Sequence, residues 1–479
     1  MKKVALFIGP LIGILTPLVV NLEGSPHASL MLGIVIWMAL WWITECVPLA
    51  VTALIPLLAF PLAGIAPAKE VAPRYMTSIM FLFIGGFLIA QAMEKTGLHR
   101  RVALQILSWC HASPLQIVMG FMITTATLSM WISNTATTML MVTIALAVLS
   151  QLDSEGEQCD VTPFAAVLLL AIAYSANIGG MGTPVGTVPN MVFLEVMTAN
   201  ASDKTPSFLQ WMVVAIPIVI TALVALLLVI RRRVQAVTWN VAIADHVAQM
   251  SGALGKMRRE EKIVAWVLGL TALAWMTRQG IQAENFNIPG WSSLLPNKGI
   301  DDGTVGIAGA LSLFLLRNDQ GKPVLEQDAF TRLPWGILIL LGGGFALAMG
   351  MQVSGLSEWI GNQIDFTDST SLIIGLLLIA FLMTFLTEVT SNTAITQVML
   401  PILAAVALAN NQDIVLMMLV ATLCSSCAFM LPVATPPNAI VFGTQRVSMS
   451  EMVSLGIRLN IIMPLIIVLI ASQLRFLLP

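Results

Sequence analysis

Charged side chains are scarce in this chain. Only 10% of its 479 residues are Asp, Glu, Lys or Arg, whereas 57% are hydrophobic, and the mean hydropathy is +0.89. A soluble domain carries about 25% charged residues, so a soluble protein of this size would lack the polar side chains that cover a surface. The composition therefore excludes a soluble globular fold and predicts an integral membrane protein.

Residues that build metal, redox and nucleic-acid sites are also few. Four histidines offer little material for a metal site, and the net charge of −2 gives no basic face for nucleic acid. The cysteines are odd in number, lack metal-ligand spacing with histidine and imply no disulfides; they are Cys46, Cys110, Cys159, Cys424 and Cys427. Because no nucleophile–base pair or metal cluster is placed at membrane depth, we do not expect an enzyme.

Long apolar runs make up most of the chain. A transmembrane helix needs roughly 20 apolar residues, and the pattern predicts about eleven spans, including a retained N-terminal helix within 1–27. The other ten are expected at about 28–45, 47–65, 77–95, 161–197, 206–230, 262–281, 303–317, 335–353, 412–446 and 450–476. The charged segment 234–261 is expected to be a cytoplasmic linker.

Two further apolar runs, at about 114–150 and 370–410, are too long for a single span. Each is interrupted in the middle by the same polar tripeptide, Ser133-Asn-Thr135 in the first and Ser391-Asn-Thr393 in the second. Irregular backbone at membrane depth is tolerated only where it is buried in protein or lines a polar cavity. The sequence therefore predicts two re-entrant helical hairpins with these tripeptides at their tips.

The two tips belong to an internal repeat. Pairs of residues separated by the same 258 positions are Gly86/Gly344, Gly97/Gly355 and Ser133/Ser391. At an offset of 252 we also pair Gly182-Thr-Pro184 with Ala434-Thr-Pro436. Because each half has an odd number of spans, the second repeat (262–479) is expected to be inverted relative to the first (28–233). Inverted repeats with broken helices are typical of secondary transporters.

The tips carry chemistry that suits an anion. The amides of Asn134 and Asn392 and the neighbouring hydroxyls can donate hydrogen bonds. The half-helix after each tip adds free backbone N–H groups and the positive end of its dipole. Two tips facing one another would hold one carboxylate each, so the pattern favours a dicarboxylate and requires no buried Arg or Lys.

Oxygen atoms near the tips suit a small cation. Ser129 and Thr387 stand four residues before the two tip serines, and the Thr-Pro breaks after Gly182 and Ala434 free backbone carbonyls. We expect one neutral Na⁺ cage in each repeat. Two Na⁺ would neutralise a dianion, and a third would make transport electrogenic, drawing about 2.3 kcal/mol per charge per 100 mV.

Other roles for these polar residues remain open. A single Ser-Asn-Thr in a helix usually caps or packs, and Thr137, Thr138 and Thr396 are left unassigned because hydroxyls also serve helix packing. Ionisable residues in or near spans are functional candidates by default, which applies to Glu45 and Glu388. For Glu388 a place at the start of a helix, facing the helix dipole, is equally expected.

Lys and Arg near the ends of the spans predict the orientation. Most of them fall on the side of Lys2 and Lys3, whereas loop 21–27 has none. By the positive-inside rule the N-terminus is expected in the cytoplasm and the C-terminus outside, in the plasma membrane of the cell.

With these residues in view, the chain resembles the divalent anion/sodium symporter family, which comprises sodium-coupled dicarboxylate, citrate and sulfate carriers. The resemblance covers nearly the whole length. The stretches that carry it are Trp42-Ile-Thr-Glu-Cys-Val-Pro48, Val51-Thr-Ala-Leu-Ile-Pro56, the two Ser-Asn-Thr tips, and Ser425-Ser-Cys-Ala-Phe-Met-Leu-Pro-Val-Ala-Thr-Pro-Pro-Asn-Ala-Ile-Val441.

The resemblance implies an elevator-type homodimer and particular site residues. The scaffold domain would come from about 1–112 and 235–368, and the mobile transport domain from about 113–234 and 369–479. Substrate would bind Ser133, Asn134, Thr135, Ser391, Asn392, Thr393, Thr435 and Pro436. One Na⁺ would bind Ser129, Ser133, Asn134 and Gly182, and the other Thr387, Thr390, Ser391, Asn392 and Ala434.

The sequence thus predicts sodium-coupled symport of C4-dicarboxylates such as succinate, malate or fumarate. The tip reads Ile132-Ser-Asn-Thr-Ala-Thr137, whereas exchanger branches of the family that it resembles often have Pro-Ser-Asn-Thr-Ala-Arg, which favours symport. The alternatives are a dicarboxylate antiporter, or a citrate or sulfate carrier of the same family.

Overall fold

The computed structural model of the chain describes residues 2–22, 26–109, 113–155, 162–235, 249–283, 286–296, 299–363 and 369–479. The predicted all-helical membrane fold is confirmed, because nine helices among these residues are long and apolar enough to cross a membrane. Five shorter apolar helices accompany them. Two of the nine, Leu372–Val389 and Asn392–Ala409, lie in the second predicted hairpin.

In the described part of the first half, all regular secondary structure is helical. Its elements are α1 (Lys2–Val19), α2 (Pro26–Thr44), α3 (Leu49–Thr52), α4 (Ile55–Leu62), α5 (Ala68–Val71), η1 (Ala72–Tyr75), α6 (Ser78–Thr96), α7 (Leu98–Leu107), α8 (Pro114–Ser129), α9 (Asn134–Glu155), α10 (Thr162–Gly180), α11 (Val188–Asn200), η2 (Ser202–Lys204) and α12 (Phe208–Gln235). The span predicted at 47–65 is broken between α3 and α4, because Pro56 has no N–H to donate to the carbonyl of Thr52.

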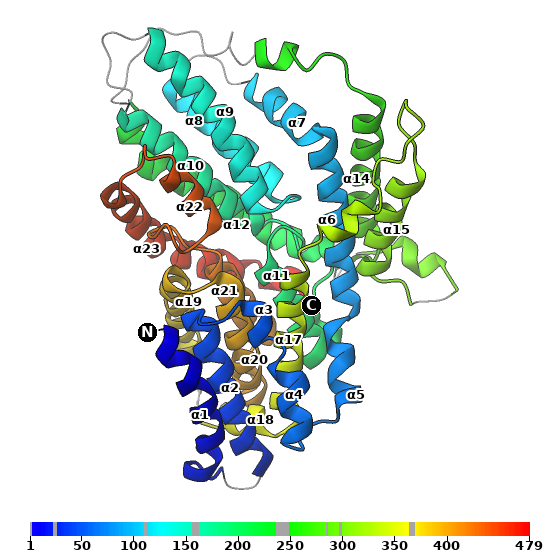
Figure 1. The fold of residues 1–479 in the computed structure, drawn as a ribbon, viewed down its shortest axis with the longest axis vertical. Coiled ribbons are helices and arrows are strands. Elements are labelled where there is room, and N and C mark those ends of the chain that lie inside the picture. The colour runs from blue at the N-terminus through cyan, green and yellow to red at the C-terminus, as the bar shows by residue number, and fades with distance from the viewer. Residues whose placement is uncertain are drawn as a thin grey trace.

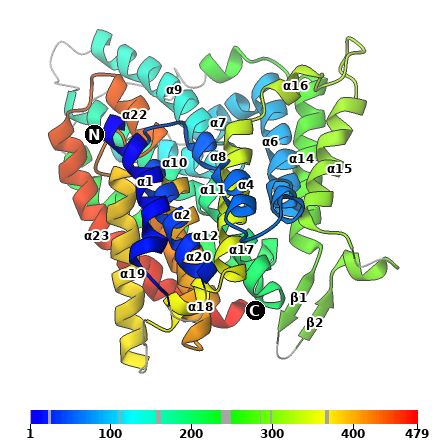
Figure 2. The ribbon, with the colours of Figure 1, turned by 60° about the horizontal axis from the view of Figure 1, so that its bottom comes forward.

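The second half adds one small sheet. Its elements are α14 (Arg259–Thr277), β1 (Gly280–Ala283), β2 (Phe286–Pro289), η3 (Trp291–Leu294), α15 (Asp302–Leu315), α16 (Asp328–Thr331), α17 (Trp335–Val353), α18 (Leu356–Gly361), α19 (Ser369–Val389), α20 (Asn392–Ala409), α21 (Ile414–Ser425), α22 (Pro436–Gly443), α23 (Met449–Gln473) and η4 (Arg475–Leu477). The antiparallel strands β1 and β2 extend away from the helices (Figure 2).

Helix pairs occupy both predicted hairpin ranges. Helix α8 begins with a capping box between Ser113 and Gln116, runs to the first tip and is followed by α9. Helices α19 and α20 are arranged in the same order around the second tip. Figure 1 shows α8, α9 and α10 together at one end of the molecule, whereas α19, α20 and α21 pack against one another, with α20 in contact with α2. The two tips point toward the middle of the molecule, between these groups.

Glycines allow two helices of the core to approach their neighbours closely. A Cβ on Gly85 of α6 would lie 2.4 Å from the carbonyl carbon of Gly306 on α15. A Cβ on Gly343 of α17 would lie 2.4 Å from the carbonyl oxygen of Ala53, at the break between α3 and α4. Distances this short leave no room for a side chain, so these positions fix α6 and α17 beside the cavity described below.

The linker predicted at 234–261 is described only in part, since residues 236–248 lie outside the described ranges. Its last residues are held to α6 and α7. Arg101 pairs with Glu261 at 3.0 Å, and a guanidinium nitrogen of Arg258 donates to the carbonyl of Thr96 at 2.7 Å. The start of α14 is therefore tied to the junction between α6 and α7.

Candidate functional site

A cavity of about 320 Å³ lies where the two hairpin tips meet. Its wall contains both Ser-Asn-Thr tripeptides and residues from six other parts of the chain. The lining residues are Leu49, Phe83, Gly86, Phe87, Ala90, Trp131, Ser133, Asn134, Thr135, Asn177, Val185, Gly186, Thr187, Val188, Pro189, Ile337, Leu340, Ser391, Asn392, Thr393, Ala434, Thr435, Pro436 and Pro437. The polar part of the lining consists of Ser, Thr and Asn side chains, and none of the lining residues has an ionisable side chain.

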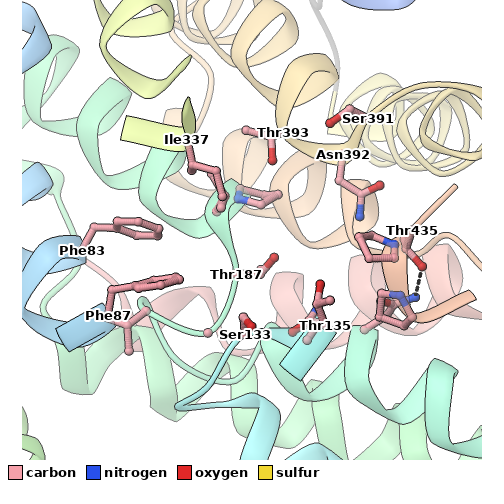
Figure 3. Close-up of a pocket in the computed structure, with 18 of the residues that line it drawn as sticks. Phe83, Phe87, Ser133, Thr135, Thr187, Ile337, Ser391, Asn392, Thr393 and Thr435 are labelled. Atoms are coloured by element: carbon pink, nitrogen blue, oxygen red, sulfur yellow. Dashed lines mark hydrogen bonds between the residues drawn. The ribbon is translucent and has the colours of Figure 1, made fainter. Parts of the chain in front are cut away.

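The two tips face one another across this cavity. In Figure 3, Ser133 and Thr135 lie on one side and Ser391, Asn392 and Thr393 on the other. All six tip residues are half-buried. Because α9 begins at Asn134 and α20 at Asn392, the first backbone N–H groups of both helices lie at the cavity. Each side therefore offers hydrogen-bond donors and the positive end of a helix dipole to an anion.

The side of the cavity away from the tips is apolar. Phe83 and Phe87, on consecutive turns of α6, have ring centroids 5.5 Å apart, and Ile337 and Leu340 of α17 add aliphatic surface. Figure 3 shows both phenyl rings and Ile337 closing one end of the cavity. A ligand with two polar ends and an apolar middle matches this division of the wall.

Three oxygen atoms converge behind the first tip. The hydroxyl of Ser129 lies 2.6 Å from Oδ1 of Asn134 and 2.8 Å from the carbonyl oxygen of Ala176. A hydroxyl has one proton, so it can satisfy only one of these two acceptors at a time. Ser129 is fully buried. An oxygen-rich site with too few protons is suited to a hard cation such as Na⁺.

The second tip repeats this arrangement. The hydroxyl of Thr387 contacts Oδ1 of Asn392 and lies 2.8 Å from the carbonyl oxygen of Ser425. Thr387 is fully buried, as Ser129 is. The two carbonyls come from the last turns of α10 and α21. Neither carbonyl was predicted from the sequence, because every residue type carries a backbone carbonyl oxygen.

Beside each tip a helix is interrupted, between α10 and α11 in the first half and between α21 and α22 in the second. An asparagine holds each of these two breaks, and the two asparagines are equivalent. Nδ2 of Asn190 donates to the carbonyls of Gly180 and Thr183 at 3.0 and 2.8 Å. Nδ2 of Asn438 donates to the carbonyls of Ala428 and Leu431 at 3.1 and 3.0 Å. In both cases the acceptors stand ten and seven residues before the asparagine.

The matching hydrogen bonds of Asn190 and Asn438 correct the residue-by-residue pairing of the two breaks in the internal repeat. The pairing of Gly182 and Thr183 with Ala434 and Thr435, made from the sequence, is wrong by four residues. The asparagines pair Gly186-Thr187-Val-Pro-Asn190 with Ala434-Thr435-Pro-Pro-Asn438. Thr187 and Thr435 each precede a helix with extended backbone, at φ −148° and −141°. The shared Thr-x-Pro-Asn pattern was the sequence signal that would have revealed this pairing.

The positions in the cavity agree with the corrected pairing. Gly186 and Thr187 line the cavity, as Ala434, Thr435 and Pro436 do. Gly182 is not among the lining residues, and a Cβ on it would lie 2.8 Å from the Met130 side chain. Thr183 donates its hydroxyl to the carbonyl of Met130 at 2.5 Å. Gly182 and Thr183 therefore support the first tip from behind.

Of the other predicted site residues, Thr390 lies at the second tip but does not line the cavity. Its hydroxyl donates to the carbonyl of Leu386 at 2.8 Å, so only its lone pairs remain for another partner. Among the residues that the structure describes, no group of three His, Cys, Asp or Glu side chains is placed to hold a metal ion.

Glu388 has a different position from the one considered from the sequence. It lies near the end of α19, not at a helix start, and its carboxylate faces the segment between α21 and α22. It accepts hydrogen bonds from the backbone N–H groups of Phe429, Met430 and Leu431 at 2.6, 2.9 and 3.0 Å. Nδ2 of Asn460 donates at 2.7 Å. Glu388 thus accepts hydrogen bonds from backbone N–H groups that have no helical partner in the segment between α21 and α22.

Known proteins similar to this chain are membrane carriers. A family model described as the sodium:sulfate symporter transmembrane region matches residues 1–478. The sodium-dependent dicarboxylate transporter SdcS of Staphylococcus saprophyticus is 38% identical over 479 residues, covering 98% of this chain and 90% of that protein. SdcS of Staphylococcus aureus strain NCTC 8325 is 38% identical over 491 residues, with the same coverage of 98% and 90%.

Two solved structures share the fold at low sequence identity. The YdaH transporter of Alcanivorax borkumensis superposes with a TM-score of 0.56 at 15% identity, over 85% of this chain and 86% of that one. MtrF of Neisseria gonorrhoeae gives a TM-score of 0.56 at 11% identity, over 86% and 83% of the two chains. These similarities concern the arrangement of helices only.

Proposed function

The chain belongs to the sodium:sulfate symporter family, and on this premise we propose that it is a secondary active transporter that couples the entry of Na⁺ to the uptake of C4-dicarboxylates. Succinate, malate and fumarate are the proposed substrates. The observation that supports this most strongly is the pair of Ser-Asn-Thr tips on opposite sides of one uncharged cavity. The SdcS relatives are named sodium-dependent dicarboxylate transporters, which agrees with this proposal.

In the proposed complex, one carboxylate binds at each tip. Ser133, Asn134 and Thr135 receive the first, and Ser391, Asn392 and Thr393 receive the second. Their amide and hydroxyl donors act together with the N–H groups at the starts of α9 and α20. Thr435 and Pro436 border the second carboxylate, and Thr187 takes the corresponding place beside the first. The short apolar chain of the substrate faces Phe83, Phe87 and the aliphatic residues of α17.

The coupling ions occupy the oxygen clusters behind the tips. The residues proposed for one Na⁺ are Ser129, Ser133, Asn134 and the backbone of Gly186, which replaces Gly182 because of the corrected pairing. The residues proposed for the other are Thr387, Thr390, Ser391, Asn392 and Ala434. Asn134 and Asn392 reach both the cation and the anion, because Oδ1 faces the cluster and Nδ2, which has no hydrogen-bond partner among the described residues, is left for the carboxylate. Bound Na⁺ would thereby orient each amide for substrate, which is a direct physical route to coupling.

We further propose an elevator mechanism in a homodimer, with the N-terminus in the cytoplasm and the C-terminus outside. The scaffold would consist of 1–112 and 235–368, and the moving part of 113–234 and 369–479, arranged as two inverted repeats. The composition of the cavity wall supports this division. All polar tip residues come from the moving part, and the apolar wall from α6 and α17 belongs to the scaffold. Moving one part against the other would carry the substrate along an apolar surface that makes no specific hydrogen bonds to it.

Uptake into proteoliposomes tests the substrate and the mode of coupling. With an inward Na⁺ gradient, labelled succinate should accumulate, and unlabelled succinate, malate and fumarate should compete better than citrate or sulfate. Strong competition by citrate or sulfate alone would instead favour a citrate or sulfate carrier. Uptake that requires an internal dicarboxylate and ignores the Na⁺ gradient would identify an antiporter.

A further inference from the structure

Asn177 connects the two halves of the chain at the wall of the cavity. It lies in the last turn of α10, and its Nδ2 is 3.2 Å from the carbonyl oxygen of Ala428 and 3.2 Å from the hydroxyl of Thr435. The dashed line at Thr435 in Figure 3 marks a hydrogen bond of this hydroxyl. Asn177 is 1% exposed and lines the cavity. A first-half residue therefore holds a hydroxyl of the second-half site.

The chemistry of its partners fixes the orientation of this amide. A backbone carbonyl can only accept a hydrogen bond, so the atom of Asn177 that faces the carbonyl of Ala428 must be the NH₂ nitrogen. The same nitrogen then presents a proton to Thr435. Oδ1 points the other way and has no hydrogen-bond partner among the described residues. Asn177 therefore acts on Thr435 as a donor only.

As a result, the hydroxyl of Thr435 is left as a donor. Its oxygen also accepts the backbone N–H of Asn438 at 3.4 Å, so both of its lone pairs face protein donors. No acceptor for the hydroxyl proton is found in the part of the chain that the structure describes, and Thr435 lines the cavity. The proton is thus available to an anion inside the cavity.

The equivalent threonine of the first half lacks this constraint. Thr187 also precedes a helix with Pro in its first turn, but its side chain makes no cap hydrogen bond. Within the described ranges its hydroxyl has no partner of any kind, although Thr187 lines the same cavity. The two ends of the cavity therefore differ: one hydroxyl is held as a donor, and the other is free to rotate.

We propose that Asn177 is a positioning residue for substrate, which orients the Thr435 hydroxyl so that it donates to an ionised carboxylate at the second tip. This inference rests on the proposed dicarboxylate transport. Asn177 itself contacts Thr435 and not the substrate. Without it, the Thr435 oxygen loses one of the two donors that occupy its lone pairs, so its proton is no longer held toward the cavity.

A double-mutant cycle tests the coupling of the two residues. The succinate concentration for half-maximal uptake at saturating Na⁺ is measured for the unsubstituted protein, Asn177→Ala, Thr435→Val and the double variant. We expect each single substitution to raise it about tenfold, the effect of one lost hydrogen bond to a charged group. Because both remove the same oriented donor, the double variant should be no worse than Thr435→Val alone.

Thr187→Val provides the matched control. Combined with Asn177→Ala, it should give the product of the two single effects, since no hydrogen bond joins Asn177 to Thr187 among the described residues. A purely structural role of Asn177 would lower the amount of folded protein or the maximal rate, and would not couple to Thr435 alone. If Asn177→Ala fails to fold, Asn177→Ser, which is too short to span the distance to Thr435, replaces it in the same cycle.

The outcomes separate this inference from the function on which it rests. Independent effects of Asn177 and Thr435, or equal coupling of Asn177 to Thr187, would overturn the positioning role while leaving dicarboxylate transport intact. An unsubstituted protein that takes up no succinate in Na⁺ would overturn the proposed transport and the positioning role together.

Discussion

The hydroxyl of Ser129 lies 2.6 Å from Oδ1 of Asn134, and the same contact joins Thr387 to Asn392 in the other half of the chain. In each pair a buried hydroxyl meets an amide oxygen and a backbone carbonyl, with one proton for two acceptors. A Na⁺ ion placed among these oxygens would satisfy all of them.

Removing either hydroxyl should weaken Na⁺ binding more than substrate binding. We expect Ser129→Ala and Thr387→Val each to raise the Na⁺ concentration for half-maximal uptake about tenfold, since one ligand of the cation is lost. The measurement is the Na⁺ dependence of uptake at saturating succinate. Thr127→Val, on the exposed side of the helix α8 that carries Ser129, should leave the Na⁺ dependence unchanged. An unaltered Na⁺ dependence in both site variants would place the cations elsewhere.

The asparagines that close the two breaks should be important for stability. In Asn190→Leu and Asn438→Leu, two buried carbonyls lose their donor, at a cost of about 1–3 kcal/mol for each unsatisfied group. The measurement is thermal unfolding of the purified protein in detergent, where both variants should unfold at lower temperature. Asn362→Leu, at an exposed position after α18, is the control. Unfolding temperatures equal to that of the control would show that these hydrogen bonds contribute nothing.

The close approach of α17 to the break between α3 and α4 gives a steric prediction. Gly343→Ala places a Cβ 2.4 Å from the carbonyl oxygen of Ala53, where the backbone cannot yield cheaply. Overpacking of this kind costs about 1–3 kcal/mol, so we expect less folded protein and a lower unfolding temperature. On the same helix, a Cβ on Gly336 meets its nearest atom at 4.0 Å. Gly336→Ala should therefore be neutral or stabilising, and a similar loss in both variants would refute the steric explanation.

The carboxylate of Glu388 should be needed to hold the segment between α21 and α22. Glu388→Gln keeps the size of the side chain but loses the charge and replaces one acceptor oxygen with an NH₂ group. Hydrogen bonds to a charged group contribute about 1.5–3 kcal/mol, so the variant should unfold at a clearly lower temperature. Glu358→Gln, at an exposed position on α18, serves for comparison. Equal unfolding temperatures of the two variants would show that the Glu388 carboxylate does not stabilise this segment.

Patterns that repeat along the chain made much of this architecture predictable. The run of apolar segments gave the helical membrane fold, and the identical tripeptides at Ser133 and Ser391 pointed to the two helix pairs and to the residues that meet at the cavity. Composition and spacing are direct records of burial and of duplication, so these features can be read without coordinates.

Other features required the structure because they depend on backbone atoms and on contacts between distant residues. The carbonyls of Ala176 and Ser425 have no sequence signature. The pairing of the two breaks was misread because Gly182-Thr-Pro184 looks more like Ala434-Thr-Pro436 than Gly186-Thr-Val188 does. The hydrogen bonds of Asn190 and Asn438 show the true equivalence, and the shared Thr-x-Pro-Asn pattern is its sequence signal. The contact between Asn177 and Thr435 crosses 258 residues and follows from no local pattern.

The central claim is that one dianion bridges both tips and is coupled to Na⁺. The most direct test is succinate uptake into proteoliposomes with an inward Na⁺ gradient, compared with choline, for the unsubstituted protein, Asn134→Ala and Asn392→Ala. We predict accumulation in Na⁺ by the unsubstituted protein, none in choline, and none in either variant, because neither tip holds the substrate alone. Equal uptake in choline, or full activity in either asparagine variant, would contradict this account.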